Sequence, residues 1–140
     1  LMPQPPAPDH PEGGEIDIFE TIDKGNVAYQ TVHSNWTLNL KKNREPLNAF
    51  RVPTSVSKWH VYGLEWDERK LVWTIDGRVV ASYAKSEDKK ALENGQWPFD
   101  APFYIIINQS VGNGRWADKP DTDYVYETKV DWIRVYQKVK

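Results

Sequence analysis

The sequence predicts an all-β fold built from antiparallel strands. Three runs rich in apolar and β-favouring residues follow one another closely, at 58–65, 71–75 and 78–83. Asp76 and Gly77 separate the second run from the third. An Asp-Gly pair between two apolar runs is a strong signal for a two-residue hairpin, because glycine accepts the positive φ that a type I′ turn requires. These runs therefore predict three consecutive antiparallel strands.

Other segments extend the β pattern. Residues 27–33 alternate as a half-buried strand does, and residues 103–109 are apolar on both faces, which predicts a central strand buried on both sides. Residues 130–135 are expected to close the sheet. One short helix is predicted at 86–95, with a serine cap at its start and a glycine at its end. The polar segment 39–57 is interpreted as a loop or a frayed hairpin.

The chain is rich in aromatic residues, with seven tryptophans and seven tyrosines among 140 residues. β-Proteins bury aromatic rings in their cores, and flat rings also stack on the faces of sugars. Trp59, Trp66 and Trp73 lie in the predicted three-strand region. We predict that these three side chains belong to the core.

An acidic stretch lies near the start of the chain, at residues 13–20, Gly-Gly-Glu-Ile-Asp-Ile-Phe-Glu. In a strand, residues two apart point to the same face, so Glu15 and Asp17 share a face. Glu20 is five positions from Glu15, and a regular strand would therefore point it to the other face. One extra residue at Ile18-Phe19, a β-bulge, would return Glu20 to the face of the other two acids.

Three carboxylates on one face repel one another, and this repulsion raises the pKa of at least one of them. A protonated carboxylic acid beside an ionised carboxylate is the pair that glycoside hydrolysis uses. The alternative interpretation is a solvent-facing strand that is merely acidic.

Residues 14–20 resemble the catalytic signature of glycoside hydrolase family 16, in its bulged, laminarinase-like form. Further segments resemble other parts of the family in the same order and spacing, namely 31–34, 59–66, 73–77, 97–104 and 130–136. The resemblance implies a β-sandwich jelly roll of two antiparallel sheets with a concave carbohydrate cleft.

The resemblance also implies a mechanism, that of a retaining endo-β-glycosidase. Glu15 would be the nucleophile, Glu20 the general acid and then the base, and Asp17 would orient Glu15. The implied substrate is β-1,3-glucan of the laminarin type or mixed-linkage β-glucan. One alternative is an endo-β-galactosidase acting on poly-N-acetyllactosamine, keratan, agar or porphyran-type chains. Another alternative is a non-catalytic glucan-binding module.

Five further residues are expected to bind the substrate: His33, Trp36, Asn108, Gln109 and Trp116. His33 would approach the carboxylates if its strand pairs with the acidic strand, and the alternative is a histidine of the surface or core. Trp36 would form a stacking platform, or else belong to the core or the rim. The resemblance places Asn108 and Gln109 as partners of sugar hydroxyls and Trp116 near the sugar.

No cofactor is expected for catalysis, and the resemblance suggests a structural calcium ion. Asp131 matches a position that helps to bind this ion in relatives. A lone carboxylate supplies only one of the six to eight oxygen ligands that calcium takes. Cysteine is absent, so the chain has neither disulfides nor thiolate ligands.

Composition limits the partners and the location. A formal net charge of −2 gives no general reason to expect nucleic acid as a partner, and no apolar run approaches the length of a transmembrane helix. A polysaccharide or oligosaccharide is the expected substrate. We expect a secreted, periplasmic or cell-surface protein.

The length predicts at most one domain, residues 1–140. The resemblance implies that this domain is the C-terminal part of a glycoside hydrolase catalytic domain, without its N-terminal strands. Each sheet of a sandwich needs a second layer to bury its apolar face. We therefore expect a complementary N-terminal chain or fragment to supply the missing strands.

Overall fold

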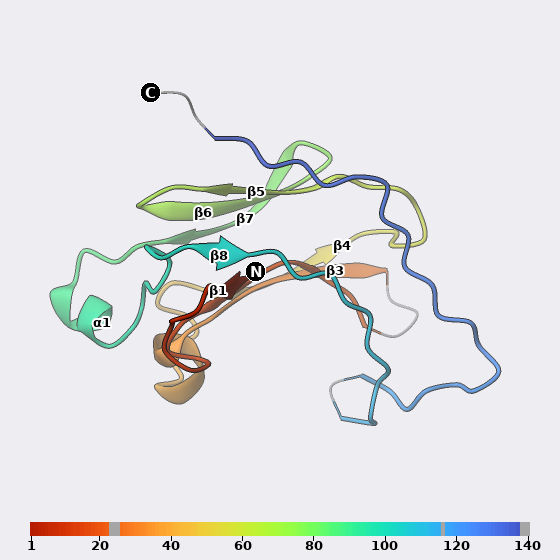
Figure 1. Ribbon diagram of the computed structural model, residues 1–140, viewed down its shortest axis with the longest axis horizontal. Coiled ribbons are helices and arrows are strands. Elements are labelled where there is room, and N and C mark those ends of the chain that lie inside the picture. Colours follow the sequence, from red (N-terminus) through yellow and green to blue (C-terminus); the bar gives the residue numbers. More distant parts are fainter. Residues whose placement is uncertain (23–25, 116, 138–140) are drawn as a thin grey trace. The chain divides into compact units, whose positions relative to one another are not determined.

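The computed structural model describes residues 1–22, 26–115 and 117–137, and the chain divides into two compact units, Leu1–Ile107 and Asn108–Lys140. The helices and strands of the described residues lie in the first unit. The strands are β1 (Met2–Pro3), β2 (Glu15–Glu20), β3 (Val27–His33), β4 (Ala49–Pro53), β5 (Tyr62–Trp66), β6 (Lys70–Ile75), β7 (Arg78–Ala84) and β8 (Phe103–Tyr104) (Figure 1). Two five-residue helices, the π-helix η1 (Asn35–Asn39) and the α-helix α1 (Lys89–Glu93), complete the unit.

The strands form antiparallel sheets, which confirms the predicted all-β class. β2, β3 and β4 form one three-stranded sheet, β5, β6 and β7 form another, and β1 pairs with β8. In Figure 1 the sheet β5–β6–β7 forms one layer and the strands β3 and β4 lie in the layer beneath it. Within the described residues, no helix has the length and apolar character needed to cross a membrane.

The hairpin between β6 and β7 has the predicted turn. Asp76 has a φ of 51° and Gly77 a φ of 77°, the two positive values of a type I′ turn. Such a turn matches the right-handed twist of the strands that it joins. Residues on each side of it pair across the hairpin, with Ile75 opposite Arg78.

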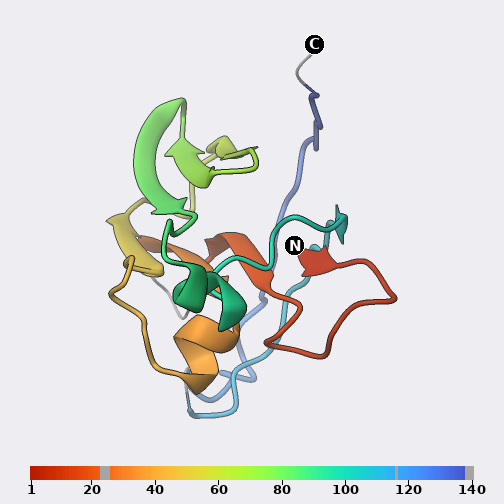
Figure 2. The same ribbon diagram turned by 90° about the vertical axis from the view of Figure 1, so that its left-hand side faces the viewer.

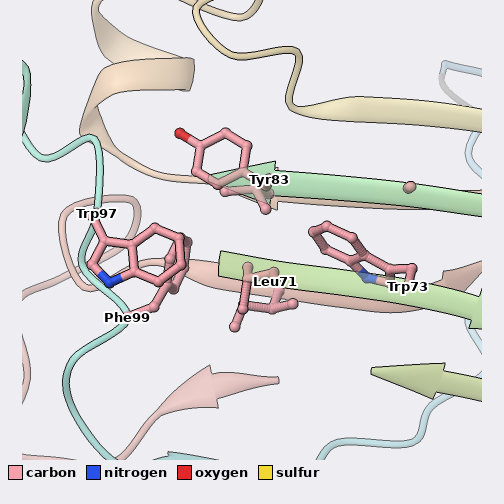
Figure 3. Packing of buried hydrophobic residues seen from close by; sticks show 8 residues of the cluster. Leu71, Trp73, Tyr83, Trp97 and Phe99 are labelled. Atoms are coloured by element: carbon pink, nitrogen blue, oxygen red, sulfur yellow. The ribbon is translucent and has the colours of Figure 1, made fainter. Parts of the chain in front are cut away.

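Side chains from the two three-stranded sheets meet in one apolar core. Ile16 and Val32 come from the first sheet, and Leu71, Trp73 and Tyr83 come from the second; all five side chains are fully buried. Figure 3 shows the last three of them together with two aromatic residues from the segment after α1, Trp97 and Phe99. The Tyr83 and Trp97 rings stack with centroids 6.2 Å apart, and Trp97 meets Phe99 edge to face at 5.1 Å. Aromatic pairs of this kind contribute about 0.5–1.5 kcal/mol each beyond the area that they bury.

The prediction for the three tryptophans is right for one of them. Trp73 is fully buried, whereas 67% of Trp59 and 38% of Trp66 are exposed. Trp59 lies before the first residue of β5, Tyr62, outside the paired region of the sheet. Trp66 lies at the other end of β5, where its ring meets Phe103 edge to face at 5.3 Å.

The predicted helix is shorter than expected. Its cap is Asp88, whose Oδ1 accepts a hydrogen bond from Lys90 N at 2.9 Å. Ser86 instead accepts a hydrogen bond from Asp88 N at 3.1 Å and precedes the helix. Gly95 has a φ of 78°, the left-handed conformation that commonly follows the end of a helix.

The segment predicted to be a loop or frayed hairpin contains strand β4, and the strand predicted at 27–33 is confirmed as β3. Asn48 follows the loop and its amide Nδ2 donates to Val32 O at 2.8 Å, which ties the start of β4 to β3. Ser34 then caps η1 through a reciprocal pair of hydrogen bonds with Thr37. Figure 2 shows η1, in orange, beside α1, and Asn35 Nδ2 donates to Asn94 O at 2.9 Å between them.

Two predicted strands are wrong in large part. Residues 103–109 contain only the two-residue strand β8, and Ile105, Ile106 and Ile107 are 45–53% exposed. Among the described residues, β8 pairs only with β1, whose own length is two residues. Residues 130–135 form no strand. The Arg134 guanidinium carbon Cζ instead lies 4.7 Å from the centroid of the Trp132 ring. An apolar sequence becomes a buried strand only where neighbouring strands satisfy its backbone and a second layer covers its face.

Candidate active site

The three acids of β2 lie on one face of the first sheet. Glu15 is opposite His33, Asp17 is opposite Thr31, and Glu20 is opposite Tyr29. The β3 partners are two residues apart in each step, so they share a face, and the register shifts between Asp17 and Glu20. The predicted bulge is therefore confirmed. Asp17 and Glu20 are three residues apart on β2, whereas their partners Thr31 and Tyr29 are two residues apart on β3. This extra residue of β2 returns Glu20 to the face of Glu15 and Asp17.

Contacts with the second sheet hold the bulge in place. The Trp73 indole Nε1 donates to the backbone carbonyl of Asp17 at 2.9 Å. Phe19, at the bulge, packs its ring on Tyr62 with centroids 4.1 Å apart. Ile16, on the opposite face from the acids, is fully buried in the core. The conformation that groups the acids is thus anchored by residues of β5 and β6.

His33 lies beside the acids, as predicted. Its Nε2 is 3.2 Å from Asp17 Oδ2. The contact with Asp17, strengthened by the charges of Glu15 and Glu20, raises the pKa of His33 above its usual value, although burial opposes this shift. His33 therefore binds a proton more readily than an isolated histidine does, and in its protonated form it partly offsets the charge of the acidic face.

The proton affinity of Glu20 is strongly raised. Burial is the largest cause and the charge of Asp17 the second, and together with Glu15 they raise the pKa of Glu20 to about 7. The nearby His33 opposes this shift. A side chain with such a pKa remains largely protonated below neutral pH and can act as a general acid.

One residue of the site has no counterpart in the sequence prediction. His10, in the proline-rich loop before β2, places its Nε2 2.9 Å from Glu15 Oε2. Its ring also meets the His33 ring edge to face, with centroids 6.2 Å apart. No periodic pattern marks a loop residue, so only the path of the folded loop reveals this contact.

Trp36 lies in η1 and not on an extension of β3. Its indole Nε1 donates to the backbone carbonyl of Glu45 at 2.9 Å, and Lys42 Nζ lies 5.9 Å from the ring centroid. A role for Trp36 as a stacking platform stays a prediction. So does a concave cleft over the acidic face.

The remaining predicted substrate-binding residues are in the second part of the chain. Asn108 and Gln109 begin the second compact unit, where both are exposed. Trp116 lies outside the described residues. The binding roles of all three stay predictions.

The calcium ion also stays a prediction. Among the described residues, no group of three or more histidine, aspartate or glutamate side chains is arranged to hold a metal ion. Asp131 is exposed in the second unit, and one carboxylate does not make a calcium site.

Fold and site together define an antiparallel β-sandwich with three carboxylates on one face of a sheet. The model of the family described as glycosyl hydrolases family 16 matches residues 4–134, and the chain belongs to this family.

Individual relatives agree with this assignment. The chain is 32% identical over 136 residues to a beta-glucanase from Rhodothermus marinus, covering 93% of this chain and 46% of the relative. It is 27% identical over 139 residues to the keratan-sulfate endo-1,4-beta-galactosidase from Sphingobacterium multivorum, covering 98% of this chain and 32% of the relative.

A solved structure extends the agreement to the fold. The endo-beta-1,3-glucanase from Pyrococcus furiosus is 31% identical and superimposes with a TM-score of 0.61, covering 81% of this chain and 43% of that chain. This match agrees with the predicted jelly roll. The chain spans less than half the length of these three relatives.

Proposed function

We propose that the protein is a retaining endo-β-glycosidase that hydrolyses internal β-linkages of a polysaccharide. The observation that supports this most is the pair formed by Glu15 and Glu20. Their strand register puts both on one face, and burial and neighbouring charges raise the pKa of Glu20 to about 7. An acid that keeps its proton near neutral pH beside a second carboxylate is the combination that glycoside hydrolysis requires.

In the first step, protonated Glu20 donates its proton to the glycosidic oxygen as the bond to the leaving sugar breaks. Glu15 attacks the anomeric carbon and forms a covalent glycosyl-enzyme. In the second step, Glu20, now ionised, takes a proton from water, and the water oxygen displaces Glu15. Because the first step needs protonated Glu20, we expect turnover to fall as the pH rises through about 7.

Asp17 and His33 act on this pair through charge. Asp17 is the largest electrostatic contribution to the raised pKa of Glu20, after burial. The His33 imidazole, 3.2 Å from Asp17, moderates this effect. We assign Asp17 the role of keeping a proton on Glu20 and helping to orient Glu15, and His33 the role of orienting Asp17.

Retention of the anomeric configuration is the part of the proposal that geometry constrains. The β3 partners of Glu15 and Glu20 are four residues apart, or about 13 Å at ~3.3 Å per residue. A retaining pair holds its carboxyl groups roughly 5–5.5 Å apart, so the two side chains must lean toward each other over the sugar. NMR of freshly released product should show the β-anomer first, and the α-anomer first would indicate inversion.

β-1,3-Glucan or mixed-linkage β-glucan is the proposed substrate. The beta-glucanase from Rhodothermus marinus and the endo-beta-1,3-glucanase from Pyrococcus furiosus support this choice. A reducing-sugar assay on laminarin, lichenan, agarose and keratan sulfate would compare the substrate classes directly. Highest activity on laminarin or lichenan is expected. Because such polysaccharides occur outside cells, a secreted, periplasmic or cell-surface location belongs to the proposal.

An endo-β-galactosidase is the second candidate. The relative named keratan-sulfate endo-1,4-beta-galactosidase supports it, and so does the exposed basic loop after η1, with Lys41, Lys42 and Arg44. Cationic side chains form strong hydrogen bonds with anionic groups such as sulfate. Activity on keratan sulfate that exceeds activity on laminarin, and that falls when Lys41 and Arg44 are replaced by alanine, would favour this candidate.

The decisive variants are Glu15→Gln and Glu20→Gln. Each should lower turnover by about 10²-fold or more, while binding of an oligosaccharide measured by calorimetry is retained. Glu65→Gln is the matched control, because Glu65 is an exposed acid on β5 of the other sheet. Near-normal turnover in either active-site variant would contradict the assignment. Binding without turnover in a wild-type domain completed by its missing strands would identify a glucan-binding module instead.

We further propose that this chain is part of a catalytic domain that another chain or fragment completes. The support is the exposed apolar surface of Ile105, Ile106 and Ile107 in the first unit, and of Val130, Trp132 and Ile133 in the second. Co-expression with candidate N-terminal strands of a family member should yield a 1:1 complex by native mass spectrometry. A chain that remains alone and is fully active would contradict the proposal.

A further inference from the structure

His10 belongs to a turn whose shape is closely determined. Gly13 N donates to Asp9 O and Gly14 N donates to Pro11 O, both at 3.1 Å, which closes residues 9–14 on themselves. Gly14 has a φ of 84°, and a Cβ there would lie 2.6 Å from Pro98 and 2.9 Å from Phe99. The end of the loop is therefore pressed against the core, and only glycine fits there.

A second contact fixes the loop on its other side. The Asn39 amide Nδ2, at the end of η1, donates to Glu12 Oε1 at 3.2 Å. The same amide also donates to Asn35 Oδ1 at 2.9 Å, within η1. Glu12 lies two residues after His10, so the loop is tied to η1 on one side and to the core on the other.

The loop held in this way brings His10 to one atom of the site. His10 Nε2 lies 2.9 Å from Glu15 Oε2, within the distance at which an imidazole and a carboxylate form an ion pair. The contact is accessible to solvent, since 42% of the His10 side chain and 29% of the Glu15 side chain are exposed. Because both side chains are partly exposed, the pair forms without burying a charge. The contact involves Oε2 of Glu15, so the other carboxylate oxygen, Oε1, is not engaged by His10.

The two histidines contact different acids of β2. His10 contacts Glu15 and His33 contacts Asp17, whereas within the described residues no histidine lies within ion-pair distance of Glu20. Glu15 and Asp17 thus each have a histidine within ion-pair distance, while Glu20, the proposed proton donor, has none among the described residues. This division matches the different roles that the two-step reaction requires of Glu15 and Glu20.

We propose that His10 is a positioning residue for Glu15: its Nε2–H donates to Glu15 Oε2, fixes the carboxylate rotamer and directs Oε1 toward the anomeric carbon. This inference rests on the proposed function, because Glu15 must be the nucleophile for its orientation to matter. A reacting group that loses its orientation by about 1 Å can lose roughly 10²-fold in rate.

Three variants of the full chain, each assayed in complex with the N-terminal fragment that completes the domain, test the inference: His10→Ala, His10→Gln and His60→Ala. The Gln amide nitrogen can take the place of His Nε2 and donate to Glu15. His60 is the matched control, since its Nδ1 lies 2.7 Å from Asp76 Oδ2 in another histidine–carboxylate pair, away from β2 in the sequence. We expect His10→Ala to lower kcat on laminarin by about 10- to 100-fold, with KM changed less than about twofold. His10→Gln should recover most of the loss, and His60→Ala should retain normal kcat.

A measurement that does not need turnover accompanies the kinetics. In protein labelled with glutamate ¹³C at the side-chain carboxyl, the Glu15 resonance, assigned by its loss in Glu15→Gln, should move in His10→Ala and stay in place in His60→Ala. A Glu15 resonance that does not move in His10→Ala overturns the inference, whether or not the protein is active.

The remaining outcomes separate the inference from the proposed function. Normal kcat in His10→Ala together with loss of turnover in Glu15→Gln would overturn the role of His10 and leave the proposed function intact. A proportional loss in His10→Ala and His10→Gln would indicate a purely structural role and would also overturn it. A wild-type domain that is completed by its missing strands and cleaves none of the four glycans would overturn the proposed function, and the NMR comparison would still decide whether His10 positions Glu15.

Discussion

The central strands of the two three-stranded sheets differ in what they bury. β6 contributes Leu71, Trp73 and Ile75 to the interior, all apolar, whereas β3 contributes Ala28, Gln30 and Val32. Gln30 is fully buried, and neither atom of its amide has a hydrogen-bond partner within the described part of the chain. The sheet of β6 therefore supplies most of the apolar packing, and the sheet of β3 carries polar groups on its interior face as well as beside the acids.

This difference suggests that one sheet mainly stabilises the fold and the other mainly carries the site. The acids lie on the sheet with the weaker apolar packing, and their arrangement depends on Trp73 and Tyr62 of the other sheet. Active sites commonly gather polar groups that do not favour stability. Substitutions in the β6 sheet should thus lower the free energy of unfolding most. Substitutions in the β3 sheet should show by how much its buried polar groups lower the free energy of unfolding.

The largest effect is expected for Trp73→Ala. The substitution leaves a cavity in the core and removes the indole hydrogen bond to Asp17, so the free energy of unfolding should fall by about 3–5 kcal/mol. Urea unfolding, followed by the circular dichroism of the backbone so that the loss of a tryptophan does not alter the signal, measures this change. Trp59→Ala, at a site that is 67% exposed, should change stability by less than about 0.5 kcal/mol. Similar losses in the two variants would refute the comparison.

A smaller effect, of opposite sign, is expected for Gln30→Met. A buried amide without partners costs about 1–3 kcal/mol, and methionine has a similar shape without polar hydrogen-bonding groups. The free energy of unfolding should therefore rise by about 1 kcal/mol in the same urea assay. A fall of that size would mean that Gln30 has a partner, such as water, in solution.

The turn of the β6–β7 hairpin should be sensitive to the loss of its glycine. Gly77→Ala places a Cβ at a φ of 77° in open space, so the change tests backbone conformation without a steric clash. The left-handed conformation costs a non-glycine residue roughly 1 kcal/mol, and stability should fall by about that amount. Unchanged stability would indicate that the turn relaxes.

The smallest effect concerns the pH dependence of stability. The pKa of Glu20 is raised from 4.5 to about 7, so the folded protein holds this proton more tightly than the unfolded chain. The stabilisation is complete below pH 4.5 and is lost as the pH rises through about 7. Because Glu20 is only partly buried, solvent screens the effect. Wild-type stability relative to Glu20→Gln should decrease between pH 4.5 and 7 in parallel urea titrations, and no decrease would contradict the raised pKa.

Much of the first unit could be predicted from local sequence. The type I′ turn at Asp76-Gly77, the alternation of β3 and the bulge in β2 are all consequences of side-chain spacing and backbone preferences within a few residues. The strand β4 was missed because its polar neighbours concealed a short alternation, Ala-Phe-Arg-Val-Pro. Residues 103–109 were predicted as a buried strand because apolar character alone does not reveal whether neighbouring strands are present.

The sequence by itself determined that Glu15, Asp17 and Glu20 would share a face, because strand geometry and one extra residue set the direction of each side chain. Only the tertiary structure decided what each acid could do. The pKa of Glu20 depends on its burial in the folded chain, and the contact of His10 with Glu15 depends on a loop closed against Phe99 and η1. The direction in which each side chain points is set by the geometry of the local backbone. The desolvation of a carboxylate and its contacts with other side chains are set by segments that meet only after folding.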